Sequence, residues 1–449
     1  MSMGKDPLYM KLYNKIEKQL ISGEILPGER LAPKRALAAS EGVSLNTVIA
    51  AYDLLVKNGL VYSAERRGYF AAGDEAERSF KGSPWSSPST RRYVFSINSN
   101  GIAKIPKRLE RARHDVEYGI EKRLLSYKEY TGNADLREQI CAYLFKTRHI
   151  SCTSEQIITA SGLNELMNLI SRLFPPDTIY AFEDPTEKKT EFALTGGKNI
   201  RTVSSGIGGF SMTELEDTGA DVFFCMPEKQ YPLGYKMTMR RREELLHWCG
   251  NERYMIEYGL CSELSFDAPL PSLYETDKNG RVIYVNTFDK VIAPGVSVAY
   301  MVLPVQLVEL FKDRLWYHHS NISEYDSLLI CEYISNGGIY SSIKRLVKAY
   351  RKKCAAALDA FSALPFADSL TFTGTGNAAF FSIAPRTGKK GYELMKHLAA
   401  RDVKLLPVSC YSLRHSHESN IFAFGYAELS EADIREGIRL IGEAWDRVI

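Results

Sequence analysis

Residues 286–300, NTFDKVIAPGVSVAY, together with the residues just before them, give the first indication of the fold of the larger part of this chain. Val282 to Val285 are β-branched and aromatic, a pattern that predicts a short buried strand. A single lysine, Lys290, stands just past that strand. Some enzymes hold a carbonyl cofactor as a Schiff base on such a lysine, so the question is whether the rest of the chain would serve it.

The composition sets outer limits on the fold and the function. With 449 residues, 45% of them hydrophobic and 25% charged, the chain is expected to form more than one globular domain. The net charge of +3 is small, so any contact with nucleic acid must come from a local patch. The chain lacks both a long apolar run and an apolar N-terminal stretch, which predicts a cytoplasmic protein without a membrane span. Eight scattered cysteines predict reduced thiols, and no metal site is expected.

From about residue 96 to residue 449, apolar strand-like runs alternate with helical stretches. Alternation over this length predicts an α/β domain with a mostly parallel sheet and helices on both faces. The expected strands are Gln156–Ala160, Ile179–Phe182, Val222–Met226, Tyr254–Ile256, Val282–Val285 and Ala299–Val302.

Residues 1–72 are predicted to form a separate compact unit. Two helices, a tight turn, a third helix and a two-stranded wing are the layout of a winged helix-turn-helix. Residues 73–95 are polar and rich in Ser and Pro, which is typical of a linker. The predicted elements are helices from Leu8 to Ile21, from Lys34 to Ser40 and from the N-cap Ser44 to about Asn58, with strands at 60–63 and 66–70.

Three groups of polar and basic residues fall where a winged helix faces a DNA duplex. Side chains in the first turn of the third helix reach base edges, whereas the start of the second helix and the wing reach phosphates. Any one group alone is explained by solvated charge, but their presence at all three places favours binding of double-stranded DNA. The residues are Lys34 and Arg35, then Ser44, Asn46 and Thr47, then Arg66, Arg67 and Gly68.

The order of residues in this unit matches a known motif. The matching stretches are Ala32-Pro33-Lys34-Arg35-Ala36-Leu37-Ala38 and Gly42-Val43-Ser44-Leu45-Asn46-Thr47-Val48. They resemble the GntR family of bacterial regulators, whose motif runs roughly P-S-x-R-x-L-A-x-x-x-G-V-S-R-x-T-V. Ala32-Pro33 replaces the usual Pro-Ser, which removes a helix-capping hydroxyl. Leu45 replaces an arginine, so one contact to DNA is expected to be missing.

The second part of the chain also carries motifs in a recognisable order. They are Ser161-Gly162, Glu183-Asp184-Pro185, Pro227-x-x-Gln230-Tyr231-Pro232-x-Gly234 and Thr287-Phe288-x-Lys290. Residues 96–449 resemble the fold-type-I aminotransferases, and the whole chain resembles the MocR subfamily of GntR regulators. The resemblance implies that Lys290 is the Schiff-base lysine of pyridoxal phosphate (PLP) and that Ser161, Gly162 and Tyr231 are cofactor contacts. It also implies a homodimer, because relatives build the cofactor cleft at a two-fold interface.

Five positions depart from the family in a direction that opposes PLP. Tyr258 stands where an acid should pair with the pyridine nitrogen, and Leu260 replaces the tyrosine that bonds the ring hydroxyl. Glu187 replaces a ring-side tyrosine, Asp289 a serine, and Ser297 an arginine near the phosphate. The carboxylates of Glu187 and Asp289 would repel the phosphate of PLP, and like charges a few ångströms apart cost about 1–4 kcal/mol even at a surface-like dielectric.

Lys290 is therefore expected to be a remnant, or a lysine that now pairs with Asp289 or Glu187. No cofactor is expected, although a desolvated lysine alone can still form an imine with PLP.

The expected function is that of a bacterial transcriptional regulator that binds a double-stranded operator. Its aminotransferase-like domain would bind an unknown small-molecule effector or serve dimerisation, without catalysis. The alternative is an active PLP-dependent aminotransferase that carries a DNA-binding head, and Tyr258 argues against it. A third interpretation keeps the fold and uses the vacated cleft for another small molecule.

Overall fold

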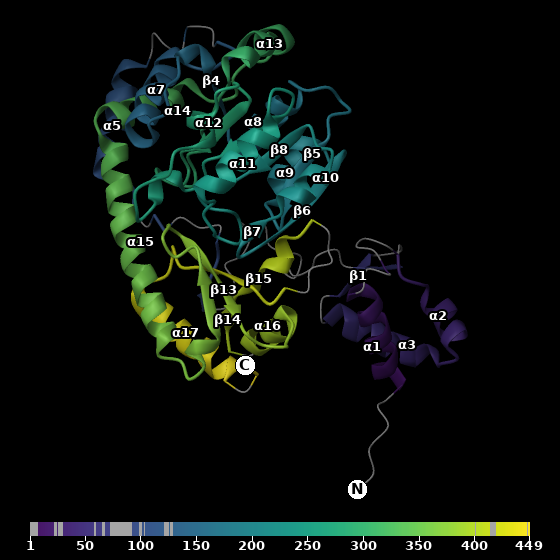
Figure 1. Cartoon of the computed structure of the whole chain (residues 1–449). Coiled ribbons are helices and arrows are strands. Elements are labelled where there is room, and N and C mark those ends of the chain that lie inside the picture. The colour runs from purple at the N-terminus through teal and green to yellow at the C-terminus, as the bar shows by residue number, and fades with distance from the viewer. Residues whose placement is uncertain are drawn as a thin grey trace. The chain divides into compact units, whose positions relative to one another are not determined.

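The structure, a computed structural model, describes residues 8–21, 25, 30–57, 60–64, 68–71, 92–97, 101–102, 104–120, 125, 129–399, 401–413, 419–446 and 448–449. The chain forms two compact units, one chiefly in residues 1–90 and the other chiefly in residues 91–449. Figure 1 labels the helices and strands of both units. The predicted fold class, a winged helix-turn-helix with an α/β domain, is confirmed.

The N-terminal unit folds around one small core. Its elements are α1 (Leu8–Ile21), α2 (Lys34–Glu41), α3 (Leu45–Lys57), β1 (Val61–Ala64) and β2 (Gly68–Ala71). Ile16 of α1 is buried together with Val48 and Leu55 of α3. The turn between α2 and α3 depends on Gly42, whose φ of +62° is left-handed and whose N–H donates to the carbonyl of Ala38. The three predicted helices and the two-stranded hairpin are all present.

An eight-stranded sheet forms the centre of the large unit, in the order β4-β11-β10-β9-β8-β5-β6-β7. Its strands are β4 (Ile157–Ala160), β5 (Tyr180–Asp184), β6 (Ile200–Gly206), β7 (Gly209–Phe210), β8 (Val222–Cys225), β9 (Tyr254–Tyr258), β10 (Val282–Thr287) and β11 (Ala299–Val302). All pairings among β5, β6, β8, β9 and β10 are parallel, whereas β7 and β11 run antiparallel to their neighbours. Every residue of β4, β5, β8, β10 and β11 is buried, which explains their nearly continuous apolar runs.

A second sheet, which the sequence did not predict, is antiparallel and lies in the C-terminal part of the unit. Its order is β12-β13-β16-β15, formed by β12 (Leu370–Thr373), β13 (Phe380–Pro385), β15 (Leu406–Pro407) and β16 (Phe422–Gly425). A separate parallel pair joins β3 (Tyr93–Val94) to β14 (Val403–Lys404). The start of the large unit is therefore fixed to its C-terminal part.

Helices cover both sheets. The 25-residue helix α15 runs along one side of the unit from α14 towards α17 (Figure 1). The helices are α5 (Lys107–Gly119), α7 (Ala134–Arg148), α8 (Leu163–Ser171), α9 (Lys188–Thr195), α10 (Met212–Asp217), α11 (Met239–Cys249), α12 (Leu273–Thr276), α13 (Val305–Leu315), α14 (Glu324–Ser335), α15 (Gly338–Ser362), α16 (Gly391–Ala399) and α17 (Glu431–Trp445), with 3₁₀ turns η1 (Ser154–Gln156), η2 (Ser262–Leu264), η3 (Ala367–Ser369) and η4 (Val408–Tyr411).

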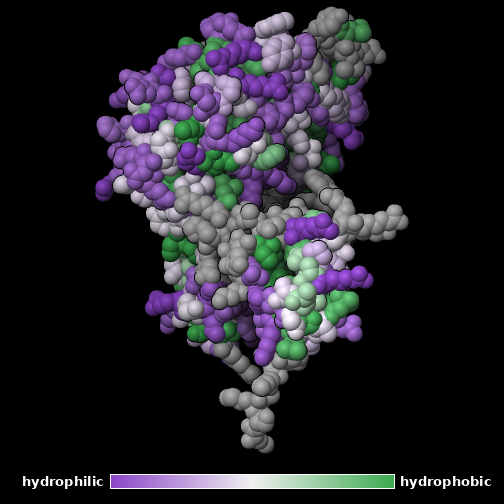
Figure 2. Space-filling view, turned by 90° about the vertical axis from the view of Figure 1, so that its right-hand side faces the viewer, coloured by the Kyte–Doolittle hydropathy of each residue, from purple (hydrophilic) through white to green (hydrophobic). Residues whose placement is uncertain are grey.

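The surface of the large unit is mainly polar where it can be seen. On the face in Figure 2, hydrophobic side chains are scattered among hydrophilic ones over the upper part of the molecule. Among the helices that the structure describes, none combines the length and the apolar character needed to cross a membrane.

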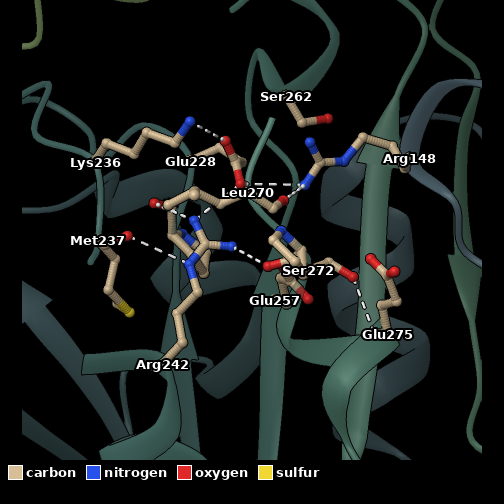
Figure 3. A network of polar contacts seen from close by, with 12 residues as sticks. Arg148, Glu228, Lys236, Met237, Arg242, Glu257, Ser262, Leu270, Ser272 and Glu275 are labelled. Carbon is tan, nitrogen blue, oxygen red and sulfur yellow. Dashed lines mark hydrogen bonds and ion pairs between the residues drawn. The ribbon is translucent and has the colours of Figure 1, made fainter. Parts of the chain in front are cut away.

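A network of buried charges lies beside the central sheet (Figure 3). The Glu228 carboxylate lies 3.1 Å from Arg148 of α7, 2.9 Å from Arg242 of α11 and 3.4 Å from Lys236. Burial opposes the charge of Glu228, but the two arginines lower its pKa below the ordinary value, so it is ionised. Arg242 also donates to the carbonyls of Pro227, Met237 and Pro271. One carboxylate thus holds two helices and two loops together.

We expect Glu228→Gln to lower the free energy of unfolding by about 3–5 kcal/mol, because it removes the carboxylate with which two buried arginines form ion pairs. Urea-induced unfolding of the full chain measures this. The matched control is Glu244→Gln, whose partners Arg240 and Arg241 have side chains that are 88% and 29% exposed; it should cost less than about 1 kcal/mol. Equal losses in the two variants would contradict the role assigned to Glu228.

Candidate functional site

The N-terminus of α3 presents the residues that were predicted to read DNA bases. The Ser44 hydroxyl accepts a hydrogen bond from the Thr47 N–H at 3.1 Å and lies 2.9 Å from the Thr47 hydroxyl. The predicted helix cap is therefore confirmed. Asn46 is exposed in the first turn, and so is Leu45, which stands in place of the arginine of the GntR motif.

The start of α2 is joined to the wing. The ammonium of Lys34 lies 4.6 Å from the centre of the Tyr69 ring on β2. Such a cation–π contact stabilises by about 0.5–1 kcal/mol where it is exposed. Pro33 makes no side-chain cap bond, as expected from the loss of the capping hydroxyl, and Arg35 is exposed. The structure therefore brings Lys34 and the wing together.

The tip of the wing falls partly outside the described residues. Arg66 and Arg67 lie there, so their position stays a prediction. Gly68 opens β2 with a φ of +109°, which favours glycine, and an added Cβ would lie 3.1 Å from Nε of Arg30. Arg30 in turn pairs with Phe70 across a β-bridge. The base of the wing is thus packed against the segment that precedes α2.

Strand ends bring the predicted cofactor residues to one edge of the central sheet. Ser161 follows β4, Glu187 lies beyond the end of β5, Tyr258 ends β9, and Lys290 lies just beyond β10. These four strands point in the same direction, and the carboxyl ends of parallel strands are where such sheets bind ligands. The residues that the sequence motifs assigned to a cofactor site therefore lie at one edge of the sheet, which we call the candidate cleft.

Lys290 is held by its neighbour in the chain. Its Nζ lies 3.2 Å from Oδ2 of Asp289, and the two side chains are 27% and 28% exposed. The other oxygen of Asp289 accepts a hydrogen bond from the Thr287 hydroxyl. Burial alone would lower the pKa of Lys290, but Asp289, followed by Cys261 and Glu187, raises it above the ordinary value. The amine is therefore protonated at neutral pH. The sequence allowed either Asp289 or Glu187 as the partner of Lys290, and in the structure the partner is Asp289.

A neutral phenol, that of Tyr258, lies where the aminotransferases have the acid that pairs with the pyridine nitrogen. Tyr258 is 4% exposed. Burial, and after it the charges of Asp289 and Glu187, raise the pKa of Tyr258 well above its ordinary value. Leu260 is buried as well and offers no hydrogen-bonding group. This side of the cleft can donate one hydrogen bond, but it cannot balance a pyridinium charge.

The phosphate side of the cleft is only partly preserved. Gly162 is the N-cap of α8, with a φ of +86° and no side-chain cap bond, so the N–H groups at this helix N-terminus could face an anion, although Glu165 lies in the first turn. The Ser161 N–H donates to Oδ1 of Asn321 at 2.8 Å. Ser297, in the place of the expected arginine, is exposed. The helix N-terminus remains, but the cation is lost.

Tyr231 lies in an aromatic cluster. Its ring stands edge-on to Tyr411 and to Phe380, at centroid distances of 5.3 and 6.0 Å. It is 7% exposed, and the neighbouring Gln230 side chain donates to the carbonyl of Pro185 at 2.8 Å. The segment predicted to contact a cofactor is thus firmly packed.

These residues do not fit PLP as the aminotransferases hold it. The cofactor needs a carboxylate at the pyridine nitrogen, a neutral amine for the Schiff base and a cation near the phosphate. The cleft supplies the phenol of Tyr258, a protonated Lys290 and the hydroxyl of Ser297. These residues meet none of the three requirements, and the N-terminus of α8 is what remains on the phosphate side.

Sequence reasoning missed a second lysine close to the cleft motif. Lys229 is fully buried, and its Nζ donates to the carbonyls of Gly374 at 3.1 Å and Asn377 at 3.4 Å. Burial lowers the pKa of Lys229 to about 8. The sequence did offer a signal for this buried lysine, because Lys229 lies inside the motif Pro227-x-x-Gln230-Tyr231 and the residues of that motif pack tightly.

Comparisons with known proteins agree with this architecture. Residues 8–70 match the family described as bacterial regulatory proteins, gntR family. The uncharacterized HTH-type transcriptional regulator YdeL of Bacillus subtilis (strain 168) is 28% identical over 98% of this chain and 97% of its own. The probable rhizopine catabolism regulatory protein MocR of Rhizobium meliloti is 27% identical over 98% and 94%. Kynurenine aminotransferase of Pyrococcus horikoshii superposes with a TM-score of 0.71 at 20% identity, over 80% of this chain and 92% of its own.

The fold and these likenesses define a transcriptional regulator that joins a helix-turn-helix domain to an aminotransferase-like domain. Its N-terminal unit matches the gntR family, and nearly the whole chain is similar to HTH-type regulators such as MocR.

Proposed function

We propose that this protein binds operator DNA through its N-terminal unit and that its aminotransferase-like domain senses a small molecule or serves dimerisation without catalysis. The observation that carries the second part is the ion pair between Lys290 and Asp289. A Schiff base forms only from a neutral amine, and Asp289 keeps this amine charged.

Three independent contacts to PLP are altered together. The partner of the ring nitrogen is Tyr258, the residue beside the ring is Glu187, and the phosphate cation is replaced by Ser297. Each contact of this kind contributes about 1–3 kcal/mol where a charged or desolvated group is involved. The loss of two weakens binding by roughly a factor of a hundred to several thousand, at about 1.4 kcal/mol per decade.

We expect the full-length protein to purify without the absorption band of an internal aldimine and to show no transaminase half-reaction. Added PLP should produce no band that borohydride bleaches. The combined variant Tyr258→Asp, Leu260→Tyr, Ser297→Arg and Asp289→Ser should recover cofactor binding, because it restores the acid, the ring contact and the cation and releases Lys290. Spectrophotometric titration with PLP measures both.

The same combined variant with Lys290→Ala is the matched control, since it keeps the new contacts and removes the amine. A wild-type protein that binds PLP with sub-micromolar affinity through Lys290 would favour the rival function, an active aminotransferase with a DNA-binding head. The N-terminus of α8 supports that rival, since it still offers an anion site.

The DNA-binding role rests on the exposed side chains at the starts of α2 and α3. Arg35 and Asn46 project into solvent. The N-terminus of α3 also bears the positive end of a helix dipole, which favours a phosphate or an electronegative base edge. The loss of a phosphate contact from Arg35 and the loss of a base contact from Asn46 should change DNA binding in different ways.

We expect Arg35→Ala to weaken binding of all duplexes alike and to reduce the slope of log K against log salt by about one unit. Asn46→Ala should instead relax discrimination between base pairs by about 1–3 kcal/mol. Fluorescence anisotropy with a duplex selected from a random library by the full-length protein measures both. Lys11→Ala, an exposed lysine of α1, is the matched control and should change neither. Full-length protein that ignores DNA at low salt would refute the proposal.

A homodimer is the assembly that this function requires, because two heads can read paired half-sites. We expect light scattering at micromolar concentration to give about twice the chain mass of 50.6 kDa. The Lys290→Ala variant should leave this mass and the DNA affinity unchanged, whereas a monomeric wild type would contradict the assignment.

A further inference from the structure

The chain reverses direction after α7 and returns along the same helix. The helix ends at Arg148, and His149 closes it with a left-handed φ of 58° and an N–H that donates to the carbonyl of Phe145. Ile150 is then fully buried, which turns the backbone towards the core. As a result Cys152 comes to lie beside Cys141, which is eleven residues earlier on the helix.

The returning segment is fixed in this position. Arg137, one turn before Cys141 on α7, donates to the carbonyl of Ser154 at 2.8 Å. Thr153 and Gln156 form a capping box around η1. The Gln156 amide also donates to the carbonyl of Leu303 at 2.8 Å. Hydrogen bonds on both sides of Cys152 therefore fix the segment that places it beside Cys141.

The two sulfur atoms are 3.7 Å apart, and both cysteines are half-buried. A disulfide bond is about 2.05 Å long, so the sulfurs need to approach each other by less than about 2 Å. Cys225, Cys249, Cys261 and Cys354 are buried, whereas Cys331 and Cys410 are half-buried like the pair. The latter two offer matched comparisons of reactivity.

The surroundings distinguish the roles of the two thiols. Cys152 donates a hydrogen bond to Cys141, and this bond lowers the pKa of Cys141. Burial and Glu155 act in the opposite direction, while Arg137 lowers the pKa further. The pKa of Cys152 is raised, because its proton is held by the neighbouring sulfur. The thiolate is thus favoured on Cys141, and a thiolate is the form that reacts with oxidants.

We infer that Cys141 and Cys152 are a peroxide-oxidisable dithiol, in which Cys141 reacts first and Cys152 resolves it. The Cys141 thiolate attacks one oxygen of a hydroperoxide, which breaks the O–O bond, forms a sulfenic acid and releases an alcohol or water. The Cys152 sulfur then attacks the sulfenic sulfur, forms the disulfide and expels water. In total two thiols and one hydroperoxide give one disulfide, one alcohol or water, and one further water.

The pair belongs to the scaffold of the cleft. Tyr143, which follows Cys141 by two residues on α7, packs its ring 5.6 Å from that of Phe288, near Lys290. Cys152 precedes β4, whose end carries Ser161. Oxidation would therefore join two elements that support the candidate cleft, and a reducing dithiol would separate them again.

The test uses full-length protein that has been reduced and freed of reductant. After treatment with a few equivalents of hydrogen peroxide, we expect titratable thiols to fall from eight to six. Mass spectrometry of proteolytic peptides should show Cys141 joined to Cys152 within one chain, and dithiothreitol should restore all the thiols. In Cys152→Ser a 1,3-diketone should trap sulfenic acid on Cys141. In Cys141→Ser the remaining Cys152 should react at least about tenfold more slowly.

The matched controls are Cys331→Ser and Cys410→Ser, which should keep the bridge and its rate. Circular dichroism and thermal melting confirm that each variant is folded. Retention of all eight thiols, equally fast oxidation of Cys331 or Cys410, or separate oxidation of Cys141 and Cys152 to sulfinic acids would each overturn the inference.

Discussion

The large unit depends on the buried carboxylate of Glu228 (Figure 3). It balances Arg148 and Arg242, and the side chains of all three residues are at most 1% exposed. Buried ion pairs stabilise a fold only when the remaining polar atoms are also bonded. Nearby carbonyls meet that need for Arg242, whereas Nε and Nη1 of Arg148 have no hydrogen-bond partner among the described residues. Since α7, α11 and the loop from residue 227 to residue 237 meet here, the placement of Lys229 and Tyr231 follows from this one charge.

Local sequence signals predicted most of the fold, and the failures have physical reasons. The buried strands of the central sheet were predicted because both their faces are covered, so that their residues form apolar runs. Strand β6 (Ile200–Gly206), next to the short edge strand β7, has mostly half-buried residues and no such run. In the second sheet β15 has only two residues and β12 is mostly half-buried or exposed, but β13 and β16 are almost wholly buried and were missed all the same. The Glu228 network was missed because its partners are 14 and 80 residues away in the chain.

The candidate cleft was easier to predict from the sequence than its chemistry. Motif order fixed which residues stand at the ends of β4, β5, β9 and β10, and the parallel sheet then brings these ends to one edge. Whether Lys290 pairs with Asp289 or with Glu187 depends on side-chain directions in a turn, which spacing alone does not determine. The ion pair at 3.2 Å decides for Asp289. Lys229 shows the same limit, because its burial depends on carbonyls near residue 375.

The scaffold of an aminotransferase site can outlast its chemistry because different forces maintain the two. The strands that end at the candidate cleft and the ring of Tyr231 are held by burial, and a substitution there costs stability. Residues that touched only a cofactor lose their constraint once the cofactor is no longer used. Around Lys290 the charges of Glu187 and Asp289 exceed that of the lysine by one negative unit, which disfavours a dianionic phosphate. The same charges keep the amine protonated, so one electrostatic cause would oppose both the phosphate of PLP and a Schiff base on Lys290.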